Sequence, residues 1–134
     1  MKYLLDADWV ISFLNGRPNA VELVSKLAEE GIALSIITWG EICEGLLAQP
    51  EFGRRLGRFN AFVAAIDLLS PDTEVARHYA QTRSHLRRRG LLIPDNALWI
   101  AATALAHNLT MVSRDQHFSR IPKLKLYQPG RRGD

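Results

Sequence analysis

The chain has 134 residues, of which 47% are hydrophobic and 23% charged, with a formal net charge of +3. This length fits one domain with a sizeable core. No apolar run approaches the ~20 residues of a membrane span, and the first ten residues carry two acids, so we expect neither a membrane segment nor a signal peptide. The single cysteine, Cys43, excludes an internal disulfide and suits a reducing cytoplasm, where we expect the protein to lie.

Short apolar segments alternate with amphipathic ones along the chain. In chain order, we expect a strand at 2–6, helices at 8–16 and 18–31, a strand at 32–37, helices at 38–49 and 52–66, a strand at 67–70, helices at 72–90 and 96–108, and strands at 109–113 and 123–128. This alternation predicts an α/β fold, with a parallel sheet of about five short strands covered by helices on both faces. We expect residues 1–128 to form a single domain and residues 129–134 to form a flexible basic tail.

Three acids lie where predicted strands end. Asp6 closes the first strand, Asp115 follows the strand at 109–113 by two residues, and Glu41 lies in the first turn after the second strand. Ligands of open α/β sheets bind beyond the carboxyl ends of the strands, so these side chains should converge there. Like charges that converge are unfavourable unless a cation lies among them, and carboxylates suit Mg²⁺ or Mn²⁺.

Each of these acids, and two neighbouring ones, also has a purely structural interpretation. Thr38 and Glu41 have the spacing of a helix capping box. Asp95 and Asp8 precede predicted helices and could cap them, and Asp115 could be a turn residue. No one of these positions decides the case alone.

Four motifs resemble one known family. They are "YLLDADWVISFLNG", "LSIITWGEICEGL", "IPDNALWIAATALAHNLTMVSRDQHF" and the closing "IPKLKLY", in this order and spacing. They resemble the PIN-domain ribonucleases, specifically the VapC-type toxins of toxin–antitoxin pairs. The resemblance covers nearly the whole chain and implies a PIN-like α/β/α sandwich.

The resemblance also implies an activity. It points to an Mg²⁺- or Mn²⁺-dependent endoribonuclease that acts on RNA, is held inactive by a cognate VapB-type antitoxin, and forms a homodimer or a toxin–antitoxin hetero-oligomer. The family's four acidic positions correspond here to Asp6, Glu41, Ala97 and Asp115. The third position is therefore vacant, and the remaining three carboxylates would hold the metal.

Further residues take supporting places in the resemblance. Ser113 stands where the family usually has a threonine that orients a carboxylate, and Asp8 looks like a supporting or substrate-facing position. Asp95 lies near the site but does not obviously replace the missing acid, because two positions along a helix rotate a side chain by about 200°. For gripping RNA, the candidates are Arg114 and the run that includes Arg87 and Arg88, although such a run also suits a solvated helix end.

Ala97 leaves two explanations open: an introduced inactivating substitution or a naturally degenerate member. In both cases we expect weaker metal binding and little cleavage. One alternative function is a non-catalytic module that binds RNA or an antitoxin. A second is a phospho-accepting receiver domain, which also clusters acids around Mg²⁺ but needs a lysine after a late strand, where this chain has Arg114.

Overall fold

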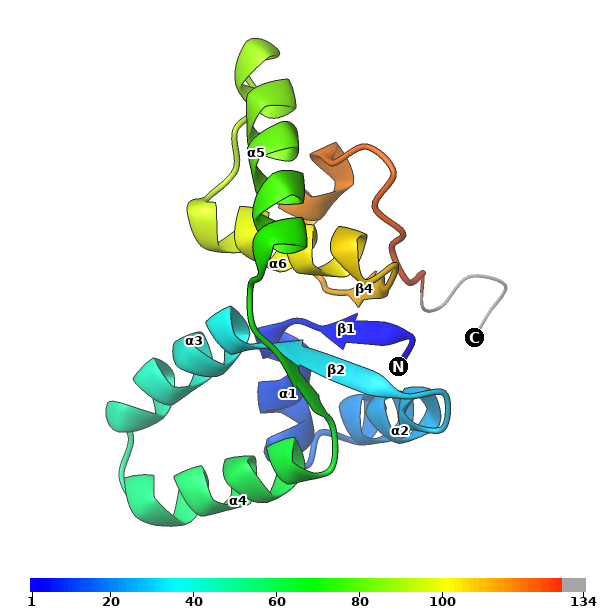
Figure 1. Ribbon diagram of the computed structural model, residues 1–134. Coiled ribbons are helices and arrows are strands. Elements are labelled where there is room, and N and C mark those ends of the chain that lie inside the picture. Colours follow the sequence, from blue (N-terminus) through cyan, green and yellow to red (C-terminus); the bar gives the residue numbers. More distant parts are fainter. Residues whose placement is uncertain (129–134) are drawn as a thin grey trace.

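A four-stranded parallel sheet lies at the centre of the computed structural model, which describes residues 1–128 (Figure 1). Its strands are β1 (Tyr3–Leu5), β2 (Ile32–Ser35), β3 (Asp67–Leu69) and β4 (Thr110–Val112), in the order β3-β2-β1-β4. The chain thus moves outward from β1 to β3 and then returns to place β4 on the other side of β1. The reversal of direction between β1 and β4 is the point at which α/β sheets of this kind bind ligands.

The segment predicted as a fifth strand, 123–128, joins the sheet at one position. Leu126 forms an isolated parallel bridge with Met111, whose N–H donates to the Lys125 carbonyl at 2.8 Å. Lys123 has a φ of +67°, which breaks the extended conformation just before the segment reaches β4. The expected tail, 129–134, lies outside the described residues.

Helices cover both faces of the sheet, as the alternating pattern predicts (Figure 1). The helices are α1 (Ala7–Leu14), α2 (Pro18–Ala28), α3 (Ile36–Leu47), α4 (Phe52–Ala64), α5 (Thr73–Arg88) and α6 (Asp95–Ala106), followed by the short 3₁₀ helix η1 (Gln116–Arg120). Side chains that alternate along β1 separate the two cores: Leu5 packs with α1–α4, whereas Leu4 packs with α5, α6 and η1. The fold is therefore an α/β/α sandwich. Within the described residues, no helix is long and apolar enough to span a membrane.

Helix starts differ from the predicted ones at two places. The hydroxyl of Ser35 accepts a hydrogen bond from the Ile37 N–H and caps α3, so the helix begins earlier than expected. Thr38 lies inside α3 with a buried hydroxyl, and Glu41 lies in the second turn, so the predicted Thr38–Glu41 capping box does not form. Strand β2 ends at Ser35, so Ser35 directly precedes the first turn of α3 and its hydroxyl can cap the free N–H groups there. Thr38 could cap the helix only if the strand continued to residue 37.

The start of α1 is capped by Asp6, whose Oδ1 accepts a hydrogen bond from the Ala7 N–H at 2.9 Å, and not by Asp8 as one interpretation expected. The start of α5 is capped by Asp72, whose carboxylate accepts a hydrogen bond from the Val75 N–H at 2.9 Å. The turn from α2 into β2 requires Gly31, which has a φ of +98° and lies against the Met1 backbone.

Candidate active site

An open cavity of about 200 Å³ lies at the carboxyl edge of the sheet, beyond β1 and β4. Its lining residues are Asp6, Glu41, Pro94, Asn96, Ala97, Ile100, Asp115, His117 and Phe118. The three predicted carboxylates and the vacant position 97 therefore share one cavity. The three carboxylates come from segments separated by more than thirty residues of chain, which the parallel topology brings to the same edge.

Asp6 is the most enclosed of the three carboxylates. Besides capping α1 through Oδ1, it accepts a short 2.6 Å hydrogen bond at Oδ2 from the Ser113 hydroxyl. Desolvation by burial raises the pKa of Asp6, and the negative charges of Asp8 and Glu41 raise it further, while the two hydrogen bonds act in the opposite direction. The neighbouring negative charges oppose the ionisation of Asp6, and a bound cation would offset this repulsion.

Ser113 links the first carboxylate to the last. Its hydroxyl donates to Asp6 and accepts from the Asp115 N–H at 2.9 Å. Asp115 in turn caps η1, accepting from the His117 N–H at 2.9 Å, and the His117 Nδ1 lies 3.0 Å from the same oxygen without hydrogen-bonding geometry. The turn after β4 is thus held to the end of β1 by one side chain, which is the orienting position that the family resemblance implied for Ser113.

Glu41 reaches the cavity from α3 and meets a residue that sequence reasoning missed. The Asn96 carboxamide donates from Nδ2 to Glu41 Oε2 at 3.2 Å, across 55 positions of chain. His117 was also missed. For Asn96, the available signal was a polar side chain directly beside the vacant position, in the first turn of the helix that faces the acids.

Ala97 presents only a methyl group to the cavity and is 9% exposed. Asp95 faces away from it: its carboxylate accepts from the Tyr79 hydroxyl at 3.1 Å and lies 3.5 Å from the Arg83 Nε. Asp95 is the first residue of α6 and its side chain does not cap the helix, which corrects the capping interpretation. Its geometry agrees with the expectation that Asp95 does not replace the missing acid.

The basic candidates occupy two different places. Arg114 stacks on the Trp9 ring, with its guanidinium carbon 3.7 Å from the ring centroid, and its Nη1 lies 3.2 Å from Asp8 Oδ2. Arg87 and Arg88 lie in the last turn of α5, away from the residues that line the carboxylate cavity. Of these three arginines, Arg114 alone adjoins the acids, and it already has an anionic partner.

A metal ion fits the chemistry of this cavity in a hydrated form. Among residues 1–128, no three His, Cys, Asp or Glu side chains are close enough together to enclose an ion directly. Mg²⁺, however, commonly keeps several waters and binds through one or two carboxylates. Asp6, Glu41 and Asp115 provide such oxygens around an open space, and Ala97 leaves one side of it without a ligand.

The PIN-domain sequence profile matches residues 3–124, nearly the whole of the described chain. The chain belongs to the PIN-domain family. This PIN domain is 30% identical to ribonuclease VapC5 of Mycobacterium tuberculosis, over 88% of this chain and 86% of that protein. It is 27% identical to ribonuclease VapC1 of Haemophilus influenzae, over 93% and 96% of the two chains. These matches confirm the resemblance to VapC-type proteins.

Solved structures agree with the sequence relatives. The PIN domain superposes on VapBC2 from Rickettsia felis, bound to a DNA fragment from its promoter, with a TM-score of 0.86 and 27% identity, covering 95% of this chain and 98% of that one. DNA-bound VapBC from Salmonella typhimurium gives a TM-score of 0.86 at 26% identity, covering 95% and 97%. The α/β/α arrangement is therefore the PIN fold.

Proposed function

We propose that this PIN domain is the VapC-type toxin of a toxin–antitoxin pair and acts as an endoribonuclease in the cytoplasm. The observation that carries the proposal is the convergence of Asp6, Glu41 and Asp115 on one cavity at the reversal point of a PIN fold. Relatives that match along almost the full chain are named ribonucleases, and one from Salmonella typhimurium is named a tRNA(fMet)-specific endonuclease.

In this proposal Asp6, Glu41 and Asp115 hold a hydrated Mg²⁺ or Mn²⁺. When bound, such an ion polarises the scissile phosphate and makes water a stronger nucleophile. The protein supplies the placement of the carboxylates: Ser113 holds Asp6 by its 2.6 Å hydrogen bond, and Asn96 holds Glu41. These hydrogen bonds restrict the orientation of Asp6 and of Glu41 before an ion binds, so less side-chain freedom is lost on binding.

Two groups of arginine side chains, at different distances from the carboxylate cavity, could bind RNA phosphates. Arg114 stands beside Asp115 and, as a positively charged group partly paired with Asp8, can contact a phosphate at the rim. Arg87 and Arg88, at the end of α5, would contact a more distant part of the RNA backbone. Asp8 then has a supporting role, because it holds the Arg114 guanidinium in place.

Ala97 impairs the activity of the chain as written, because the cavity lacks the fourth carboxylate. A naturally degenerate member that binds RNA or an antitoxin without cleaving is the second candidate function, and the methyl group at position 97 is the observation in its favour. An introduced substitution explains the same methyl group, and the two origins predict the same behaviour for this chain.

RNA cleavage by the Ala97→Asp variant tests the proposal. We expect this variant to cut structured cellular RNA with Mg²⁺ or Mn²⁺ and to stop when a chelator is added. Adding Asp6→Asn should abolish cleavage, whereas Asp67→Asn, an exposed acid on β3 outside the cavity, should leave it unchanged. Cleavage that survives Asp6→Asn would contradict the assignment. Binding of RNA without cleavage by every variant would favour the non-catalytic function.

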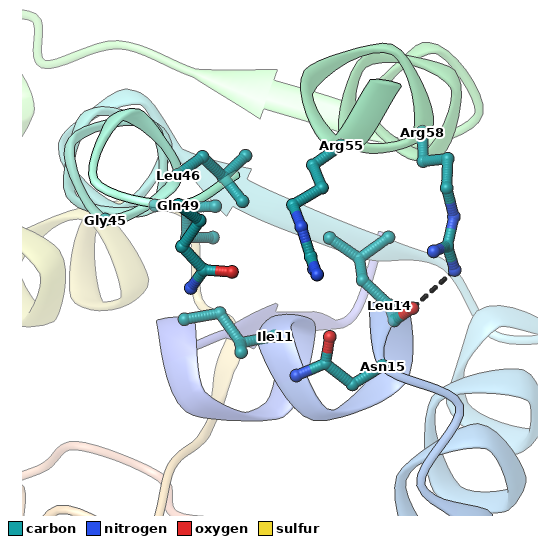
Figure 2. A pocket seen from close by; sticks show the side chains of 9 residues that line it. Ile11, Leu14, Asn15, Gly45, Leu46, Gln49, Arg55 and Arg58 are labelled. Atoms are coloured by element: carbon teal, nitrogen blue, oxygen red, sulfur yellow. Dashed lines mark hydrogen bonds between the residues drawn. The ribbon is translucent and has the colours of Figure 1, made fainter. Parts of the chain in front are cut away.

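A groove between α1, α3 and α4 provides a surface for the antitoxin (Figure 2). Its lining residues are Ile11, Leu14, Asn15, Ile42, Gly45, Leu46, Gln49, Arg55 and Arg58. Ile11 is 42% exposed although it is a large apolar side chain, and Arg55 points into the groove from α4. Because the superposed relatives are VapBC complexes, we propose that a VapB-type antitoxin fills the groove with apolar anchors and an acidic side chain near Arg55. The resulting assembly is a hetero-oligomer.

Substitution in this groove tests the partner proposal. Co-expression with the cognate antitoxin should give a complex that Leu46→Asp disrupts, because a carboxylate would be buried against apolar groups. The matched control is Val21→Asp, since Val21 is similarly apolar and 37% exposed but lies on α2 outside the groove. A complex that is equally stable in both variants would place the antitoxin elsewhere.

A further inference from the structure

A second open cavity, of about 350 Å³, adjoins the carboxylate cavity on the other side of the turn after β4. Its lining residues are Ser113, Arg114, Asp115, Gln116, Ser119, Leu126, Tyr127 and Gln128. Of the residues that the structure describes, Asp115 alone lines both cavities. A molecule bound here would therefore lie next to the proposed reaction centre. The volume of the cavity is in the range of ordinary small-ligand sites.

The walls of this cavity carry neutral polar groups that lack internal partners. The carboxamides of Gln116 and Gln128 form no hydrogen bond with residues 1–128, so their donors and acceptors are available to a ligand. The Ser119 hydroxyl donates to the Gln116 carbonyl at 2.7 Å and keeps its acceptor capacity. Tyr127 packs edge-on against Tyr3, with 5.9 Å between ring centroids, so its ring has a packed partner on the core side of the wall.

The charges around the cavity disfavour an anion as its occupant. Among residues 1–128, the charged residues that line the cavity are Arg114, which is paired with Asp8 and stacked on Trp9, and Asp115, whose carboxylate is part of the wall. A phosphate placed inside the cavity would face that carboxylate directly. A neutral, flat molecule with both donors and acceptors suits two free carboxamides and a tyrosine better.

We infer that this cavity, hereafter the base subsite, binds one unpaired nucleobase of the RNA next to the scissile phosphate. The inference rests on the proposed ribonuclease function. Sequence-specific recognition of RNA generally targets splayed single-stranded bases through hydrogen bonds to their edges. A carboxamide offers a donor and an acceptor side by side, which matches such an edge, and Asp115 ties the base subsite to the carboxylate cavity.

Base preference in cleavage provides the first test. In the Ala97→Asp background, a set of oligonucleotides that differ only at the nucleotides flanking the cut should show a preference at one position. The double variant Gln116→Ala/Gln128→Ala should reduce that preference by about tenfold or more, the scale of one lost bidentate base contact. Gln81→Ala, an exposed glutamine on α5 outside both cavities, is the matched control and should leave the preference unchanged.

Binding to the chain as written provides the second test and separates the two proposals. Fluorescence anisotropy with the same single-stranded oligonucleotides should show the preference with Ala97 in place, and its loss in the double variant. If the Ala97→Asp variant never cleaves but binding still depends on Gln116 and Gln128, the ribonuclease proposal fails and the base subsite stands. If the folded double variant keeps the original base preference in both assays, or if no preference exists, the base subsite is overturned.

Discussion

Restoring a carboxylate at position 97 should strengthen Mn²⁺ binding by roughly 30- to 150-fold. A carboxylate and a divalent ion 4 Å apart interact by about 2 kcal/mol in water and about 8 kcal/mol at the effective dielectric near a protein surface. The cavity is open and the proposed ion is hydrated, so the Ala97→Asp carboxylate lies near the lower of those limits, at about 2–3 kcal/mol. Each 1.4 kcal/mol corresponds to about a tenfold change in Kd, which gives the stated range.

The same substitution should destabilise the metal-free protein, because a fourth negative charge joins Asp6, Glu41 and Asp115. Calorimetric titration with Mn²⁺ gives the affinities, and thermal unfolding with chelator and with Mn²⁺ gives the two stabilities. We expect the Ala97→Asp variant to have the lower Tm with chelator and the larger increase with metal. Ala97→Asn is the control of similar shape without the charge. If it binds Mn²⁺ as tightly as Ala97→Asp, or if the chain as written already does so, the electrostatic reasoning is wrong.

Three further variants test the supporting contacts. Ser113→Ala removes the 2.6 Å hydrogen bond to Asp6 and should lower the free energy of unfolding by about 1–2 kcal/mol in denaturant titrations, whereas Ser113→Thr should not. The raised pKa of Asp6 means that its contribution to stability is present below the unfolded pKa of 3.8 and is lost as pH rises through the folded pKa. Asp6→Asn should therefore stabilise the chelated protein at pH 7, by a margin that shrinks as pH falls toward 3.8; a constant margin would contradict this. Asp72→Ala should cost about 1 kcal/mol through loss of the α5 cap, measured by denaturant unfolding against Asp67→Ala.

Alternation of apolar and amphipathic segments was sufficient to predict the layers of the fold, because buried strands and amphipathic helices have different periods. All six predicted helices are present, with boundaries that shift by a few residues. The largest local error concerns Thr38 and Glu41. Ser35 and Thr38, three positions apart, could each have capped α3, and the end of β2 at Ser35 decided for Ser35. At 123–128, the positive φ of Lys123 has no obvious sequence signal and reduces a predicted strand to one bridge.

The candidate site was predictable where topology alone determines position. Asp6 and Asp115 follow neighbouring parallel strands, so their meeting requires only the strand order. The contact between Asn96 and Glu41 depends instead on how α6 is rotated against α3. The pattern of apolar residues along the two helices does not determine this rotation closely enough to place a single side chain. Likewise, sequence reasoning left Arg114 free for RNA, whereas packing places it over Trp9 and beside Asp8. The catalytic and metal-binding roles of these residues remain predictions.

The strand order has a consequence for the newly made protein. The groove between α1, α3 and α4 is complete in sequence at Arg58, and the core beneath it takes almost all of its side chains from residues 3–66. The carboxylate cavity needs Asp115, from the segment after the last strand to join the sheet. At about 5–20 residues per second, synthesis reaches Asp115 roughly 3–11 seconds after Arg58. Synthesis thus completes the sequence of the proposed antitoxin surface before it adds the last of the three carboxylates.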